Sequence, residues 1–206
     1  MATISENLTE LIAQKDRIAS EVSSQTNLIS QIKTVLEQKA SGEVPPSKLA
    51  SYIEGTMTEV TAEDLEGATS LRDRAFYYSP ITSVVIPNTV TSIGQYGFGY
   101  CNKLKSVIIG NSVTSIGNSA FYECSSLTSV TIPNSVTSIK AYALQIGSNT
   151  TKATIRFLGT TPPTITTATF NKNYLNQIIV PKGYGDTYKS ATNWSHFADL
   201  IVENET

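Results

Sequence analysis

The chain has 206 residues, of which 40% are hydrophobic and only 16% are charged, and its formal net charge is −2 at pH 7. This length suits one or two domains. Because no basic run occurs, we expect no nucleic-acid partner and no anionic-membrane partner, since both require clustered Lys and Arg. No stretch approaches the ~20 apolar residues of a membrane span, so we expect no membrane insertion.

Residues 1–41 are predicted to form one long helix, because neither Gly nor Pro occurs before Gly42. Their apolar residues follow a heptad pattern, which is typical of a coiled coil. The predicted oligomerisation residues are Ile4, Leu8, Leu11, Ile18, Val22, Ile29, Ile32 and Leu36. Leu and β-branched residues are mixed on both seams, which leaves dimer and trimer open. We expect a homo-oligomer, and a trimer in particular; the alternative is a helix that packs on its own domain.

Residues 42–56 are predicted to be a linker. Gly42, Pro45 and Pro46 end the long helix. A short helix is expected to follow, with Ser47 as its N-cap and Gly55 at its end. The segment would join an N-terminal stalk to a C-terminal head.

Residues 57–146 contain a motif that recurs every 23 residues. The matching apolar positions are Ile81, Leu104, Leu127; Val84, Val107, Val130; Ile86, Ile109, Ile132; Val90, Val113, Val136; Ile93, Ile116, Ile139; and Phe98, Phe121, Leu144. Phe76 occupies the same register one unit earlier. Residues 147–206 are predicted to contain a longer insertion, a last irregular repeat at Leu175–Val180, and a C-terminal cap.

Each unit contains a Val-x-Ile pair, which predicts a short strand with two inward side chains. One such unit cannot bury its apolar side alone, but stacked units can, because identical residues then form ladders about 4.8 Å apart. The small residues Gly97, Ala120 and Ala143 are expected where neighbouring backbones pass closely, beside the buried aromatic. The predicted fold class is α+β: an N-terminal coiled-coil helix followed by a short solenoid of strands with a C-terminal cap.

Few residues suggest catalysis or metal binding. Cys101 and Cys124 occupy one ladder position, where a disulfide is possible but two small buried thiols are expected. The one histidine, His196, lies beside Trp194 and Phe197 and is expected to belong to the cap, because zinc requires three or four closely spaced N or S ligands. We expect no catalytic residues, no metal site and no cofactor.

The turn near each aromatic is rich in tyrosine. The candidate ligand-binding residues are Tyr77, Tyr78, Tyr96, Tyr100, Tyr122 and Tyr142. Tyrosine offers apolar area and a hydroxyl group at a low entropic cost, which suits contact with a glycan or a protein. The alternative is that these rings fill gaps between turns or pack against a neighbouring chain.

The pattern LxxVxIPxxVxxIxxxAFxxCxx resembles the BspA-like, or treponemal-type, leucine-rich repeat family. The resemblance is strongest over residues 59–145, and residues 160–201 resemble the family's C-terminal cap. Two departures lie in the last regular unit, where Lys140 replaces a glycine and Leu144 replaces the aromatic. The resemblance implies a right-handed leucine-rich repeat solenoid that acts in surface recognition and adhesion rather than as an enzyme.

The heptad helix that ends in LEQKASGEVPPSKLASYIEG, followed by MTEVTAEDLEGATSLRDRAF, resembles the front end of phage and prophage tail or fibre proteins. No basic segment followed by an apolar run begins the chain, so we expect no secretory signal. Together these features favour a receptor-binding phage appendage, assembled in the host cytoplasm, that contacts other virion proteins through its helix and a bacterial surface glycan or protein through its head. The alternatives are a purely structural fibre or capsid-decoration protein, and a bacterial cell-surface adhesin.

Overall fold

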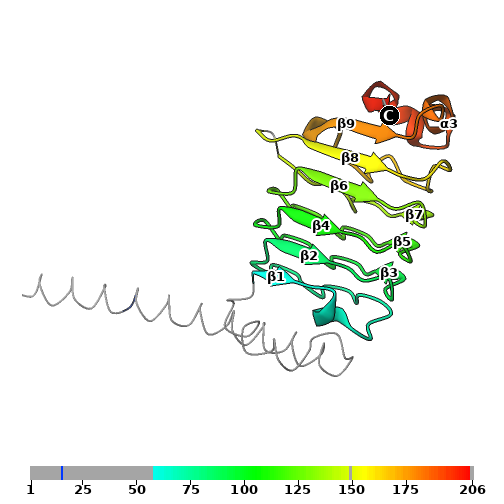
Figure 1. Cartoon of the computed structure of the whole chain (residues 1–206). Coiled ribbons are helices and arrows are strands. Elements are labelled where there is room, and N and C mark those ends of the chain that lie inside the picture. Colours follow the sequence, from blue (N-terminus) through cyan, green and yellow to red (C-terminus); the bar gives the residue numbers. More distant parts are fainter. Residues whose placement is uncertain (1–14, 16–57, 149, 205–206) are drawn as a thin grey trace, which may run out of the picture.

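The computed structural model describes Lys15, residues 58–148 and residues 150–204. The predicted oligomerisation residues of the N-terminal helix and the predicted linker over residues 42–56 lie outside the described residues. From residue 58 onward the chain forms a solenoid of stacked coils, in which the strand of each coil lies beside the strand of the next (Figure 1). This arrangement confirms the predicted leucine-rich repeat solenoid of short parallel strands with a C-terminal helical cap.

Two sheets lie on one side of the solenoid, and all their strands are parallel. One sheet contains β1 (Glu59–Val60), β2 (Ser83–Val85) and β4 (Ser106–Ile108). A second sheet contains β6 (Ser129–Ile132), β8 (Ala153–Phe157), β9 (Leu175–Val180) and β10 (Ile201–Glu203). The register pairs Val84 with Val107, one repeat later, as the recurring motif predicted.

A third parallel sheet lies where each coil returns. Its strands are β3 (Ser92–Ile93), β5 (Ser115–Ile116) and β7 (Ser138–Ile139). Beside them the Thr114 hydroxyl donates to the Thr91 carbonyl at 3.1 Å, and the Thr137 hydroxyl donates to the Thr114 carbonyl at 3.2 Å. Side-chain hydrogen bonds therefore connect successive coils in addition to the sheet.

Aromatic rings form a column through the core, at the position where the motif places its aromatic residue. The rings of Phe76 and Phe98 are stacked with centroids 5.2 Å apart, and those of Phe98 and Phe121 are 5.1 Å apart. Leu144 ends the column and is fully buried. Stacking of like residues explains why the motif recurs, since each coil provides the surface on which the next one packs.

The segment between Leu144 and Leu175 corrects the sequence analysis, which predicted an insertion there. It forms a further coil, because β8 lies between β6 and β9 and pairs Ile155 with both Val130 and Ile178. Thr164 bridges Ser138, so this coil also reaches the return side. The prediction missed the coil because its apolar positions are not spaced as in the regular units.

The closest backbone approaches also differ from the prediction. A Cβ atom at Gly117 would lie 2.8 Å from the Gly94 backbone, whereas one at Gly97 would meet first a side-chain atom of Ile93 at 3.1 Å. Ala120 and Ala143 carry a Cβ and are fully buried. Gly110, which follows β4, approaches even more closely, since its added Cβ atom would lie 2.5 Å from the Pro87 backbone. Glycines that follow strands on both sides of the solenoid therefore allow the coils to stack closely.

The cysteine ladder is buried and its thiols are free. The Cys101 thiol donates to the Phe76 carbonyl at 2.9 Å, and the Cys124 thiol donates to the Phe98 carbonyl at 3.1 Å. Burial raises the pKa of Cys101 to about 12 and that of Cys124 well above its usual value. Both residues act as small buried side chains, as predicted.

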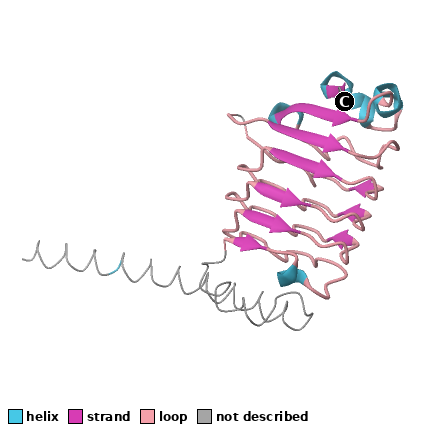
Figure 2. Cartoon of the chain, in the orientation of Figure 1, coloured by secondary structure: helices cyan, strands magenta, loops and turns pink. Residues whose placement is uncertain are grey.

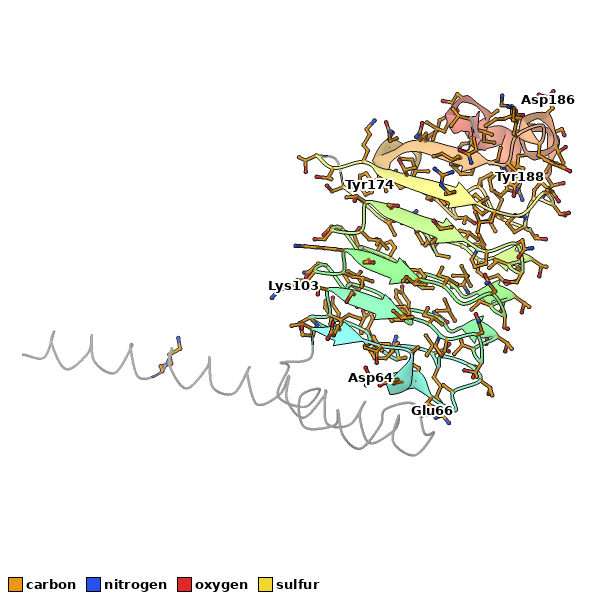
Figure 3. All side chains as sticks on the ribbon, viewed as in Figure 1. Asp64, Glu66, Lys103, Tyr174, Asp186 and Tyr188 are labelled. Atoms are coloured by element: carbon orange, nitrogen blue, oxygen red, sulfur yellow. The ribbon has the colours of Figure 1, made fainter. Side chains whose placement is uncertain are left out.

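The C-terminal cap covers the last coil. Its short helices are α3 (Gly185–Ser190) and the 3₁₀ segment η3 (Trp194–Leu200) (Figure 2); two further 3₁₀ turns, η1 (Glu63–Leu65) and η2 (Lys172–Tyr174), lie in the first and last coils. Tyr188 and Trp194 are buried, and their rings meet edge to face at 4.9 Å. Tyr188 and Asp186 lie at the end of the stack opposite Asp64 and Glu66 (Figure 3).

Candidate functional site: a tyrosine surface on the turns

Six tyrosines occupy the turns on either side of the Phe column, and we call them the tyrosine surface. Its members are Tyr77, Tyr78, Tyr96, Tyr100, Tyr122 and Tyr142. In the motif they stand two residues before the column position, one residue after it or two residues after it. Each of four successive coils therefore contributes at least one ring at the same edge of the solenoid.

The structure brings all six rings into one connected cluster. Tyr77 meets Tyr78, Tyr96 and Tyr100 edge to face, with centroids 4.6, 5.5 and 5.6 Å apart. The Tyr78 and Tyr100 rings are stacked at 4.7 Å. The remaining edge-to-face contacts join Tyr100 with Tyr122 at 5.4 Å, Tyr96 with Tyr122 at 6.5 Å and Tyr122 with Tyr142 at 6.4 Å.

The tyrosine surface faces solvent rather than the core. Tyr78 is 62% exposed and Tyr142 is 47% exposed, and the other four are half-buried. Edge-to-face and offset contacts between rings stabilise their arrangement by about 0.5–1.5 kcal/mol for each pair. The rings therefore form an ordered aromatic surface that carries hydroxyl groups.

Four of these tyrosines have backbone conformations that favour glycine. The φ angles are +59° at Tyr78, +54° at Tyr96, +60° at Tyr100 and +61° at Tyr142. A left-handed conformation at a residue other than glycine costs on the order of 1 kcal/mol or more and is frequent at functional sites. Gly or Asn would satisfy these turns at a lower cost, so the fold alone does not explain tyrosine at these positions.

Arg74 joins the cluster, and the sequence analysis missed it. Its guanidinium carbon lies 5.6 Å from the Tyr77 ring centroid and 5.9 Å from that of Tyr96, within the range of cation–π contacts. Arg74 also has a positive φ angle, +61°. Its register was a usable signal, because it stands two residues before Phe76 as Tyr96 stands two residues before Phe98.

The phenol groups of Tyr77, Tyr100 and Tyr122 are uncharged at neutral pH. Burial is the main cause that raises the pKa of Tyr77, Tyr100 and Tyr122 above the ordinary value of 10.0, and the neighbouring tyrosines raise it further. Uncharged phenols both donate and accept hydrogen bonds. The site can therefore offer ring faces, hydroxyl groups and the Arg74 cation, with the Glu123 carboxylate near Tyr100 and Tyr122.

Other candidates among the described residues do not form a site. His196 is exposed and its ring contacts only the Phe197 ring, at 4.8 Å, among the aromatic contacts. No group of three or more His, Cys, Asp or Glu side chains is arranged to hold a metal ion in the described ranges. The part of the chain that the structure describes also contains no helix long and apolar enough to cross a membrane.

Comparison with known proteins identifies the repeats. The family described as "BspA type Leucine rich repeat region (6 copies)" matches residues 69–196. The match includes the coil around β8 and part of the cap, which the 23-residue period did not cover. No curated protein matches the chain.

Several solved structures are similar to this chain. The T. pallidum leucine-rich repeat protein TpLRR is 21% identical over 60% of this chain and 58% of its own, with a TM-score of 0.48. The pneumococcal vaccine antigen PcpA is 14% identical over 73% of this chain and 42% of its own, with a TM-score of 0.52. A leucine-rich cell surface protein from Faecalibacterium prausnitzii is 27% identical over 59% of this chain and 47% of its own, with a TM-score of 0.33. The chain thus spans less than two thirds of the length of each of these proteins, and PcpA supports the solenoid fold.

Proposed function

The chain belongs to the BspA-type leucine-rich repeat family, and from that premise we propose that it is a non-enzymatic protein that recognises a bacterial surface through its tyrosine surface. One observation carries the proposal: six solvent-facing tyrosines from successive coils touch one another at a single edge of the solenoid. Amphipathic aromatic rings are enriched where proteins bind partners.

The test is the binding of fluorescently labelled protein to intact bacterial cells, followed by flow cytometry. The triple variant Tyr96→Ala, Tyr100→Ala, Tyr122→Ala should lose binding by at least about tenfold, since each lost contact of a buried aromatic anchor typically costs more than about 1 kcal/mol. Tyr184→Ala is the matched control, because Tyr184 is 38% exposed and lies outside the tyrosine surface. Circular dichroism must show that all variants keep the fold; equal binding by the folded triple variant would refute the proposal.

We propose further that the heads are presented as a homo-oligomer, a trimer, through the heptad of residues 1–41. Several heads on one stalk would strengthen weak binding by raising the effective concentration. Light scattering after size exclusion should give a trimer for the whole chain and a monomer for a chain that starts at Gly42. If both chains are monomers, the proposal that residues 1–41 form an oligomeric stalk is wrong.

Two locations fit this role. A bacterial cell-surface adhesin is favoured by the family match, which covers residues 69–196 and includes only the last eight residues of the segment that resembles phage tail and fibre proteins. The phage or prophage appendage, in contact with other virion proteins, is the second candidate because of the heptad. Protease treatment of intact cells should release fragments of a cell-surface protein, whereas an appendage should appear in phage particles purified by density gradient.

A further inference from the structure

We propose that the Arg74 end of the tyrosine surface binds the carboxylate of an acidic glycan, with a sugar ring placed on the neighbouring tyrosines. This proposal rests on the recognition role proposed above and names the chemical class of its ligand. Three features of that end of the surface support it. The Arg74 guanidinium group lies on two rings, the exposed Tyr78 ring lies next to it, and the backbone N–H groups of this edge already donate hydrogen bonds to the next coil.

The guanidinium group is positioned to receive an anion. It contacts the rings of Tyr77 and Tyr96, and within the described part of the chain it forms no ion pair with a carboxylate. The nearest carboxylate in sequence, Asp73, instead accepts the backbone N–H of Gln95 at 2.7 Å. An arginine held against aromatic rings keeps the in-plane N–H groups that bind a carboxylate through two hydrogen bonds.

An aromatic face suited to a sugar ring lies beside this cation. Tyr78 stacks one face of its ring on Tyr100 and still has 62% of its surface exposed. Much of this ring is therefore open to solvent, although the Tyr77 ring meets it edge to face at 4.6 Å. The apolar C–H face of a pyranose can stack on such a ring, while the phenol groups of Tyr77 and Tyr100 bind sugar hydroxyls.

The backbone of this edge argues against an extended acidic peptide. The N–H groups of Arg74, Tyr78, Tyr96 and Tyr100 all donate to carbonyl groups of the next coil, at 2.7–2.9 Å. A peptide that adds as a strand needs free main-chain groups, and these are already occupied. Ring faces, hydroxyls and one guanidinium group remain, and this set matches a carboxylated pyranose.

The experiment compares three probes by biolayer interferometry with the full chain: polygalacturonate, the same polymer with its carboxylates methyl-esterified, and polyglutamate. The variant Arg74→Asn removes the charge and keeps the backbone feasible, since Asn tolerates a positive φ angle. Lys105→Ala is the control, because it removes one exposed positive charge away from the tyrosine surface. Arg74→Lys keeps the charge but loses the two-point geometry.

We expect the unmodified protein to bind polygalacturonate and to bind the ester and polyglutamate only weakly. The affinity for polygalacturonate should fall by about tenfold or more in Arg74→Asn, fall less in Arg74→Lys, and stay unchanged in Lys105→Ala. Equal binding of acid and ester, no effect of Arg74→Asn, or no binding of polygalacturonate would each overturn the acidic-glycan proposal. Arg74-dependent binding of polyglutamate at the same strength would overturn the carbohydrate assignment. The tyrosine role is judged separately by cell binding, so the two proposals can fail independently.

Discussion

Replacing Ser79 with alanine should stabilise the protein, although it removes a buried polar side chain. Ser79 stands where the next two coils have Cys101 and Cys124, whose thiols donate to a carbonyl of the preceding coil. The Ser79 hydroxyl is buried, and no group in the described part of the chain accepts its hydrogen bond. An unpaired buried hydroxyl costs on the order of 1–3 kcal/mol, so its removal should raise the free energy of unfolding by about 1 kcal/mol after a small loss of packing.

Urea unfolding followed by the fluorescence of the buried Trp194 measures this change. A gain of about 1 kcal/mol corresponds to a rise in Tm of roughly 2–4 °C for a chain of this size. Ser135→Ala is the matched control and should have the opposite sign, because the Ser135 hydroxyl donates to the Val113 carbonyl at 2.8 Å. If Ser79→Ala destabilises the protein as much as Ser135→Ala does, the reasoning about the unpaired hydroxyl is wrong.

Three further predictions concern the core, the cap and the cysteines. Phe98→Ala should lower the free energy of unfolding by about 3–5 kcal/mol, because the ring is fully buried between two others; chemical denaturation measures this, and a loss below about 1 kcal/mol would contradict the stacked column. The Glu203 carboxylate accepts hydrogen bonds from the N–H groups of Gly183 and Gly185, which lower its pKa in the folded protein. Its stabilising effect should therefore be complete above the ordinary glutamate pKa of about 4.3 and disappear as the pH falls through the lower pKa of the folded state. The free energy of unfolding should therefore fall less between pH 6 and about pH 3 for Glu203→Gln than for the unmodified protein. An equal fall in both proteins would contradict this prediction. Cys101 and Cys124 should react with a thiol reagent at pH 8 only after unfolding, and rapid labelling of the native protein would contradict their burial.

The solenoid could be predicted because its repeats appear in the sequence as apolar residues that recur at a fixed period. The recurrence of Val84 predicted the strand of each coil, that of Ile93 predicted its return segment, and that of Phe98 predicted the column of rings in the core. The structure confirms all three. The coil around Ile155 and Phe170 was missed, because Ile155 is 25 residues after its partner Val130 rather than 23. Sheet pairing tolerates a longer loop between strands, whereas a search for a fixed period does not.

The candidate site could be predicted only as a set of residues. Sequence register placed the tyrosines near one turn, but it contained no information on ring orientation or on the positive φ angles at Tyr96 and Tyr100. These depend on how the coils stack, which brings Tyr77 against Tyr96 and Tyr100 from the next coil. The register of Arg74 indicated this edge of the solenoid, but only the stacked structure places its guanidinium group on two rings.

The most direct test of the central claim is hydroxyl-radical footprinting of the full chain with and without envelope fragments of the bacteria it binds, read by mass spectrometry. The account predicts that Tyr78 and Tyr142, the most exposed rings of the tyrosine surface, become protected, while the exposed Tyr184 in the cap is oxidised as before. Protection of Tyr184 with unchanged oxidation of Tyr78 and Tyr142 would place recognition on the cap and contradict the account.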